Sequence, residues 1–272
     1  MVVFPNAKIN IGLKILSKRE DGYHNLQTIF AAIALKDALE VIEAKQGSEG
    51  VQFTSSGLYV PGAVEGNLCV QAYQLLKQDF PALPAVQMHL HKTIPMGAGL
   101  GGGSADAAFA LQLINQKFSL HLTTKQLLSY AGQLGSDCPF FIVNKACYAT
   151  GRGEILEPIN LDLSTYAILL LNPGIHISTS LAFDNIKIGE HPQDLRKLVV
   201  QDIDTWKHAI VNDFEETVFA AYPEIALIKT TLYELGALYA SMSGSGSSVY
   251  GIFPKAKLPA FNFPAHYYQR WV

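Results

Sequence analysis

Residues 95–104 read Pro95-Met96-Gly97-Ala98-Gly99-Leu100-Gly101-Gly102-Gly103-Ser104, which places five glycines within seven positions. An alternating pattern at 86–91 predicts a strand before them, and the alanine-rich run 105–116 predicts a buried helix after them. A strand, a glycine-rich turn and a helix N-terminus form an anion site, because backbone N–H groups and the helix dipole face the anion. Fixing so many glycines in one conformation costs conformational entropy. Binding of a phosphate is the leading candidate for the interaction that offsets this cost.

This loop departs from two common phosphate-binding motifs. Gly97-x-Gly99-x-x-Gly102 fits the dinucleotide fingerprint, but it lies far from the first strand, and no acid follows about 20 residues later to hold a ribose. A Walker A loop needs a lysine after its last glycine, where this chain has Ser104. A tight strand-to-helix turn would need only one or two glycines, so a phosphate loop of another type is favoured.

The composition is that of a folded globular protein. Of 272 residues, 49% are hydrophobic and 16% are charged, and the net charge of −3 argues against a nucleic-acid binder, which would carry a basic stripe. Cys69, Cys138 and Cys147 lack metal-ligand spacing and are expected to be reduced core residues. We find no secretory signal and no apolar run long enough to span a bilayer, so a cytoplasmic protein is expected.

The remaining patterns predict an α+β chain in two lobes, 1–158 and 159–272, with a strand-rich first half and a helix-rich second half. Asn67 and Ser104 are the expected N-caps of the helices that follow them. The predicted strands are 2–16, 39–44, 51–53, 86–91, 140–143, 146–150, 166–171, 237–242 and 248–253, with a hairpin around Asn144-Lys145. The predicted helices are 68–77, 105–116, 124–133, 194–198, 213–220 and 223–234.

Further polar residues suit chemistry, and each has a plain structural alternative. Lys8 and Asn10 share one face of the first strand, which could simply be solvated. The turn at 21–24 places Tyr23 beside His24, and Asp137 lies between a helix-ending glycine and a Pro-Phe-Phe run. Either a helix N-cap or a catalytic carboxylate explains Asp137. The run Ser-Gly-Ser-Gly-Ser-Ser at 243–248 lies between two apolar strands, which favours a second backbone anion contact over a linker.

A metal ion is also expected from the charges near the loop. Asp106 lies in the first turn of the predicted helix, where a carboxylate suits the dipole but would repel a nearby phosphate. A cation placed between them would remove the repulsion. Mg²⁺ is the expected cation, with Asp106 and Ser104 as candidate ligands. The sequence does not define a full set of ligands.

Together these segments resemble the GHMP kinases, small-molecule kinases whose ATP phosphates lie in a glycine-rich loop unlike Walker A. The Asp-Gly-Tyr-His sequence at 21–24 is specific to one subgroup, whose substrate is a sugar alcohol linked to cytidine diphosphate. The resemblance implies an N-terminal lobe like ribosomal protein S5 domain 2 and a ferredoxin-like C-terminal α/β sandwich. It runs from residue 5 to near residue 253 and is carried by 5–10, 21–28, 95–108, 135–141, 151–156 and 172–174.

The resemblance also implies roles for individual residues. It implies transfer of the γ-phosphate of ATP to a substrate hydroxyl, with Asp137 as the catalytic aspartate and Lys8 beside it. Lys8 would keep Asp137 ionised and, with Mg²⁺, supply the positive charge that the loop lacks. The implied ATP-binding residues are Pro95, Met96, Gly97, Ala98, Gly99, Leu100, Gly101, Gly102, Gly103, Ser104, Asn67 and Leu68. The implied substrate-binding residues are Asn10, Tyr23, His24 and Phe183, with Tyr23 and His24 on the cytosine base.

Three alternatives stay open beside this hypothesis. A GHMP kinase for a mevalonate- or homoserine-type alcohol would have no base to stack on Tyr23. A non-catalytic nucleotide-binding protein would not need both Lys8 and Asp137. A dinucleotide-dependent oxidoreductase is a remote alternative.

The sequence departs from the family pattern at three serines. Ser180 stands where proline is common among the kinases, and Ser243 and Ser245 stand where threonine is common. The expected partners are ATP and a small CDP-linked substrate, with no nucleic acid or membrane, for a monomer or weak homodimer.

Overall fold

A computed structural model describes residues 1–178, 182–183, 186, 188 and 194–272, which form two compact units. Unit 1 comprises Met1–Ala7, Ala34–Met96 and Gly101–Asn144, and unit 2 comprises Lys8–Ile33, Gly97–Leu100 and Lys145–Val272. The two units interleave along the chain, and the single lobe boundary predicted near residue 158 stays a prediction. In each unit, strands and helices together form the mixed α/β architecture that the sequence predicts.

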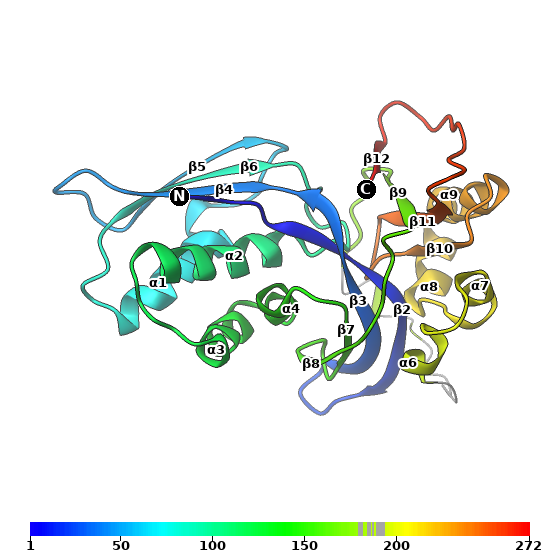
Figure 1. Ribbon diagram of the computed structural model, residues 1–272, viewed down its shortest axis with the longest axis horizontal. Coiled ribbons are helices and arrows are strands. Elements are labelled where there is room, and N and C mark those ends of the chain that lie inside the picture. The colour runs from blue at the N-terminus through cyan, green and yellow to red at the C-terminus, as the bar shows by residue number, and fades with distance from the viewer. Residues whose placement is uncertain (179–181, 184–185, 187, 189–193) are drawn as a thin grey trace. The chain divides into compact units, whose positions relative to one another are not determined.

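Unit 1 is built on a four-stranded sheet whose buried face is covered by helices (Figure 1). The strand order is β1 (Val2–Val3), β4 (Ala38–Glu43), β6 (Val86–Lys92) and β5 (Val51–Gly57). β6 is antiparallel to β4 and parallel to β5, and its residues alternate between buried and partly exposed. The helices are α1 (Leu68–Asp79), preceded by η1 (Val64–Gly66), α2 (Gly102–Lys117), α3 (Thr124–Leu134) and α4 (Cys138–Val143).

Local capping accounts for the ends of these helices. The Asn67 side chain accepts a hydrogen bond from Cys69 N at 2.9 Å, which confirms the predicted cap of α1. Helix α2 starts at Gly102, with Gly101 as its N-cap, so the prediction that Ser104 caps this helix is wrong. The low helix propensity of glycine is the reason for predicting a later start of this helix. The helix nevertheless begins with glycine because its backbone packs closely here: an added Cβ on Gly102 would lie 2.9 Å from Ile94 Cγ2.

Residues 138–143 form helix α4, so the predicted strand at 140–143 and its hairpin with 146–150 are wrong. Pro139 lies in the first turn of α4, where an N–H has no intrahelical partner and its loss has little cost. Asn144 ends the helix in the left-handed conformation, with φ of 50°. A short buried apolar run gives the same pattern in a strand as in a buried helix, which explains the error.

Unit 2 contains two four-stranded sheets. In the first, the order is β2 (Asn6–Lys18), β3 (His24–Lys36), β7 (Cys147–Thr150) and β8 (Ile155–Pro158), and β7 pairs antiparallel with β3 and β8. In the second, antiparallel neighbours follow the order β10 (Tyr239–Met242), β11 (Val249–Pro254), β9 (Tyr166–Asn172) and β12 (Tyr268–Trp271). Strands β3, β8 and β12 were not predicted, whereas the predicted strands at 166–171, 237–242 and 248–253 are confirmed.

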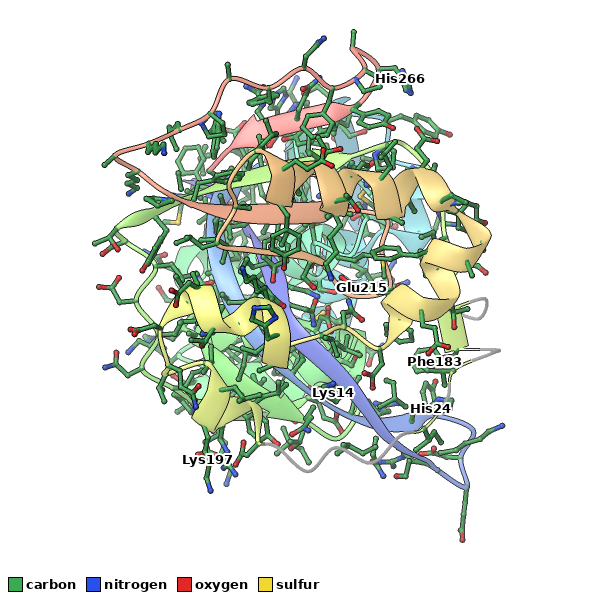
Figure 2. The ribbon with its side chains drawn as sticks, turned by 90° about the vertical axis from the view of Figure 1, so that its right-hand side faces the viewer. Lys14, His24, Phe183, Lys197, Glu215 and His266 are labelled. Carbon is green, nitrogen blue, oxygen red and sulfur yellow. The ribbon has the colours of Figure 1, made fainter. Side chains whose placement is uncertain are left out.

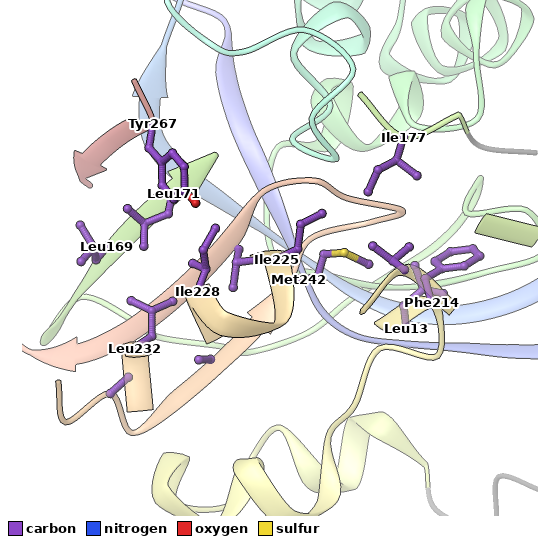
Figure 3. Packing of buried hydrophobic residues seen from close by; sticks show 14 of the residues in the cluster. Leu13, Leu169, Leu171, Ile177, Phe214, Ile225, Ile228, Leu232, Met242 and Tyr267 are labelled. Atoms are coloured by element: carbon purple, nitrogen blue, oxygen red, sulfur yellow. The ribbon is translucent and has the colours of Figure 1, made fainter. Parts of the chain in front are cut away.

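The core of unit 2 lies between the second sheet and helices α8 (Phe214–Ala221) and α9 (Pro223–Glu234) (Figure 3). These two helices are confirmed within a residue at each end, as is the short α6 (Leu195–Leu198) after its Asp194 cap. A further short pair is η2 (Ile203–Thr205) and α7 (Trp206–Ala209). Leu169 and Leu171 of β9 face Ile228 and Leu232 of α9 across this core.

Two expectations about the whole chain can be compared with these elements. Cys69, Cys138 and Cys147 are buried and unpaired with one another, as predicted for reduced core residues. Among the residues that the structure describes, no helix combines the length and the apolar character needed to cross a membrane.

Candidate active site

Backbone geometry requires glycine at most positions of the loop. Gly97, Gly99 and Gly101 have φ of 61°, 76° and 68°, in the left-handed region that side chains disfavour. A Cβ on Gly99 would also lie 1.9 Å from the Ser243 carbonyl oxygen. Gly103 differs, because a Cβ there would meet only Leu68 Cδ1 at 3.8 Å and Met96 Cε at 4.0 Å. Packing and conformation therefore explain the other glycines without a ligand, and leave Gly103 with space in front of it.

In unit 1, the residues predicted to contact ATP lie together around the N-termini of two helices. Leu68 begins α1, and its side chain lies beside Gly103 in the first turn of α2. Met96 reaches the same position. Two helix N-termini side by side present unpaired N–H groups and positive dipole ends, which favour an anion. The loop residues Gly97–Leu100, by contrast, belong to unit 2.

In unit 2, Gly97–Leu100 is held by β2 and by the serine-rich loop at 243–248. Ser243 Oγ donates to the Gly99 carbonyl at 2.7 Å, and Ser248 N donates to the Ala98 carbonyl at 3.3 Å. Lys8 N donates to the Leu100 carbonyl at 3.0 Å. The structure thus brings together two loops that were predicted separately from their small residues.

Lys8 and Asn10 are buried next to this contact, with 3% and 2% of their surfaces exposed. Lys8 Nζ donates to Asn10 Oδ1 at 2.5 Å and lies 4.8 Å from the centroid of the Phe30 ring. Asn10 Nδ2 donates to Thr28 Oγ1 at 3.0 Å, and the Tyr250 hydroxyl donates to the Asn10 carbonyl at 2.8 Å. This burial excludes a solvated strand face, and Asn10 is one residue that orients the Lys8 ammonium.

Asp137 belongs to unit 1 and immediately precedes α4. It is partly buried, and its side chain forms no capping hydrogen bond with the helix. Asp137 thus occupies the predicted N-cap position, with Pro139 in the first turn, but its side chain does not cap the helix. Its backbone position follows from Gly135, which ends α3 and turns the chain toward the short helix.

A buried ionic cluster in unit 1 could not be predicted from the sequence. Lys92 Nζ lies 2.5 Å from Asp37 Oδ2 and 2.6 Å from Asp106 Oδ2, and the three side chains are 0–4% exposed. Asp37 Oδ1 also accepts hydrogen bonds from Thr93 N and Ile94 N, at 2.6 and 2.8 Å. Lys92 is thus one cation beside Asp106, and the expected Mg²⁺ stays a prediction. The only signal in the sequence is Lys92 at a buried position of the alternating strand.

Burial raises the pKa of Asp106 to about 7, against the opposing attraction of Lys92. A raised pKa means that the folded chain holds this proton more tightly than the unfolded chain, so stability is lost as pH rises toward 7. Between pH 5 and pH 7.5, we expect the unfolding free energy of the wild type to fall relative to that of Asp106→Asn. Urea unfolding of both proteins at the two pH values measures this, and parallel profiles would contradict it.

The residues predicted to bind the base lie together in unit 2. The His24 and Phe183 rings stack with centroids 4.6 Å apart and planes 15° apart, and both are seen in Figure 2. The Phe214 and Phe183 rings are nearly perpendicular, with their centroids 4.8 Å apart. Burial, with a smaller effect of Lys18, lowers the pKa of His24, so its neutral ring can both donate and accept a hydrogen bond at pH 7. The neighbouring residue Tyr23 is 56% exposed.

Asn212 is a further residue that the sequence analysis missed. Its Nδ2 donates to the carbonyls of Met242 and Gly244 at 2.8 Å each and so shapes the start of the serine-rich loop. An asparagine just before a helix usually indicates a cap, which hides this longer-range role.

Unit 2 also contains a cavity of about 610 Å³, whose lining includes Asp162, Asp202 and Trp206. None of the predicted site residues lines it.

Comparison with known proteins defines the class. The N-terminal domain of GHMP kinases matches residues 67–145, and the C-terminal domain of GHMP kinases matches residues 194–261. Mevalonate kinase from Methanococcus jannaschii superposes with a TM-score of 0.72 over 94% of this chain and 92% of its own, at 12% identity, which shows the fold alone. The mixed α/β units described above are those of a two-domain GHMP kinase.

Closer relatives narrow the assignment. A protein of Azobacteroides pseudotrichonymphae is 51% identical over 98% of this chain and 99% of its own. One of Bacteroides fragilis is 49% identical over 97% of each. Both are named 4-diphosphocytidyl-2-C-methyl-D-erythritol kinase. A crystal structure of 4-(cytidine 5'-diphospho)-2C-methyl-D-erythritol kinase superposes with a TM-score of 0.79 at 30% identity, over 93% of this chain and 90% of that one. The chain belongs to the 4-diphosphocytidyl-2-C-methyl-D-erythritol kinase family, and it is an enzyme that uses ATP and a small-molecule substrate.

Proposed function

We propose that this chain transfers the γ-phosphate of ATP to the 2-hydroxyl of 4-diphosphocytidyl-2-C-methyl-D-erythritol, in the non-mevalonate route to isoprenoid precursors. The observation that carries the proposal is the aromatic group of unit 2, in which the exposed Tyr23 precedes His24 stacked on Phe183. A cytosine base can stack on such rings, whereas a simple alcohol has no aromatic face to offer. This favours a cytidine-linked substrate over the mevalonate- or homoserine-type alternative.

The loop and the helix N-termini of unit 1 suit the phosphates of ATP. The open position at Gly103, with Leu68 and Met96 beside it, gives an anion access to the first turn of α2. Asn67 orders the start of α1 on the same side. We propose that Pro95–Ser104 and Asn67-Leu68 together hold the nucleotide, as the family resemblance implies.

Phosphoryl transfer depends mainly on positioning and electrostatics. We propose that Asp137 accepts the proton of the substrate hydroxyl as the phosphoryl group leaves ATP. Lys8, oriented by Asn10 at 2.5 Å, would neutralise charge that develops on the transferred group. The hydroxyl, its base and the phosphorus atom must be aligned for the transfer to proceed.

We propose Mg²⁺ as the metal that accompanies ATP. Among residues 1–178, 182–183, 186, 188 and 194–272, no group of three or more His, Cys, Asp or Glu side chains could hold a metal ion. Such a protein fits Mg²⁺, which is commonly held by substrate phosphates, water and one or two protein ligands. Ser104 and Asp106 remain the candidates in the first turn of α2, since Lys92 occupies Oδ2 of Asp106 and leaves its Oδ1 without a hydrogen bond. When bound, the ion neutralises phosphate charge.

We further propose that the protein is cytoplasmic and is a monomer or a weak homodimer.

A turnover assay tests the proposed function. Purified protein is incubated with ATP, Mg²⁺ and 4-diphosphocytidyl-2-C-methyl-D-erythritol, and ADP release is followed with mevalonate and homoserine as alternative substrates. We expect turnover with the cytidine-linked substrate alone. Turnover of mevalonate or homoserine in its place would reject the proposal.

Replacing Tyr23 by alanine is expected to raise KM for the cytidine-linked substrate about 10-fold or more, because base–aromatic stacking is worth about 1–3 kcal/mol. KM for ATP is expected to change little. Steady-state kinetics with each substrate varied in turn measures both constants. Tyr59→Ala, at a tyrosine of unit 1 that is 83% exposed, is the matched control. Equal increases in both KM values would place Tyr23 outside the base site.

A further inference from the structure

The Tyr23 ring has a cation on one face. Arg152 Cζ lies 4.6 Å from the ring centroid, within the range of a cation–π interaction. Among the residues that the structure describes, no carboxylate forms an ion pair with this guanidinium. Tyr23 as a residue nevertheless remains 56% exposed. Arg152 therefore lies over one face of the ring, while more than half of the residue's surface stays accessible to a ligand.

The turn that carries Arg152 is firmly built. It connects β7 to β8, and the Gly151 carbonyl accepts a hydrogen bond from Leu26 N of β3 at 2.8 Å. The Glu154 carboxylate folds back and accepts from Arg152 N at 2.6 Å. Gly151 has φ of 70°, and a Cβ there would lie 2.9 Å from that carboxylate. The backbone at Arg152 is thus fixed beside the start of β3, from which Tyr23 extends.

The turn that carries Tyr23 is also ordered by hydrogen bonds. Tyr23 N donates to Asp21 Oδ1 at 3.1 Å, and the Tyr23 carbonyl accepts from Arg19 N at 2.8 Å. Arg19 in turn binds the Asp21 carboxylate with Nε and Nη2, at 2.9–3.1 Å. The backbone of Tyr23 is held by these bonds, so Arg152 is the group that restrains its ring.

From this geometry we propose that Arg152 is a specificity-determining residue, which holds the Tyr23 ring so that its other face receives the pyrimidine base. The inference rests on the proposed function and deepens it. Arg152 acts through Tyr23 and is thus a positioning residue. An exposed side chain loses rotamer freedom when a ligand immobilises it, and a ring held beforehand avoids much of this cost. The expected gain in affinity is that of one exposed cation–π pair.

The binding of cytidine 5'-diphosphate to the full chain, measured by calorimetry, tests this role. We expect Arg152→Ala to weaken binding about 2- to 5-fold, with kcat and KM for ATP unchanged. Arg152→Lys is expected to recover part of the loss, since an ammonium also binds an aromatic face. In a Tyr23→Ala background, Arg152→Ala is expected to have no further effect, because the ring through which it acts is absent.

The chain offers a matched control in Arg196, whose Cζ lies 4.7 Å from the centroid of Tyr148. Arg196→Ala removes a similar pair outside the proposed base site and is expected to leave binding unchanged. Binding that is unaltered in Arg152→Ala, or weakened as much with Tyr23→Ala as without it, would overturn the inference while the proposed function stands. A wild type that neither binds cytidine 5'-diphosphate nor turns over the cytidine-linked substrate would overturn both.

Discussion

Asp137→Asn is expected to lower kcat by about 10²- to 10⁴-fold, the usual contribution of a general base, while ATP still binds. Asparagine keeps the size of the side chain and cannot accept the proton of the substrate hydroxyl. The Asp137 side chain does not cap α4, so its replacement removes no capping hydrogen bond from that helix. An unfolding free energy like that of the wild type would assign the observed loss to chemistry.

The test combines turnover with nucleotide binding. Single-turnover kinetics gives the rate of phosphoryl transfer, and calorimetry with ADP gives the affinity of the nucleotide site. Asp162→Asn is the control. Asp162 Oδ1 accepts a hydrogen bond from Ser164 N at 2.8 Å at the surface, so this variant is expected to change neither turnover nor nucleotide affinity. Near-normal turnover in Asp137→Asn would remove Asp137 from the role of base.

The largest effect on stability is expected from Lys92→Met. This change removes the ammonium 2.5 Å from Asp37 and 2.6 Å from Asp106, so the buried Asp37 carboxylate loses its cation and the raised pKa of Asp106 rises further. Breaking a buried ion pair in this way costs about 3–5 kcal/mol. Urea unfolding at pH 7.5 measures the change in the free energy of unfolding.

Two further variants show whether charge is the cause. Adding Asp37→Asn and Asp106→Asn to Lys92→Met is expected to recover at least half of the loss, since no uncompensated charge remains. Lys229→Met breaks the pair of Lys229 with Glu215 at 2.6 Å, whose side chains are 20% and 10% exposed, and should cost less. A loss in Lys92→Met no larger than that in Lys229→Met would contradict the account.

Elements with local signals could be predicted from the sequence. The start of α1 at Leu68 and the end of α3 at Gly135 follow from capping residues within a few positions. Strand β6 follows from strict alternation. Strand β3 was missed because it begins in a polar turn at His24, and α4 was mistaken for a strand because its apolar run is too short to show a period.

The candidate site shows the same division. The glycine loop and the Tyr23-His24 pair are contiguous in sequence and could be found there. The Lys92 cluster could not, since Asp37 lies 55 residues away and nothing in the sequence links the two. The position of Arg152 over Tyr23 also depends on the pairing of β7 with β3, which only the folded chain displays.

The interleaving of the two units has a consequence for synthesis on the ribosome. Strand β2 is made early, yet Asn10 bonds with Ser243 and Tyr250, 233 and 240 residues later. The sequence of unit 1 is complete once Asn144 has been made, whereas β2 must wait for almost the whole chain. Until then its buried residues Leu13 and Ile15 lack the late residues of their core, such as Tyr267, which makes the nascent chain prone to aggregation. Fragments that end near residue 158 would keep β2 in that state permanently.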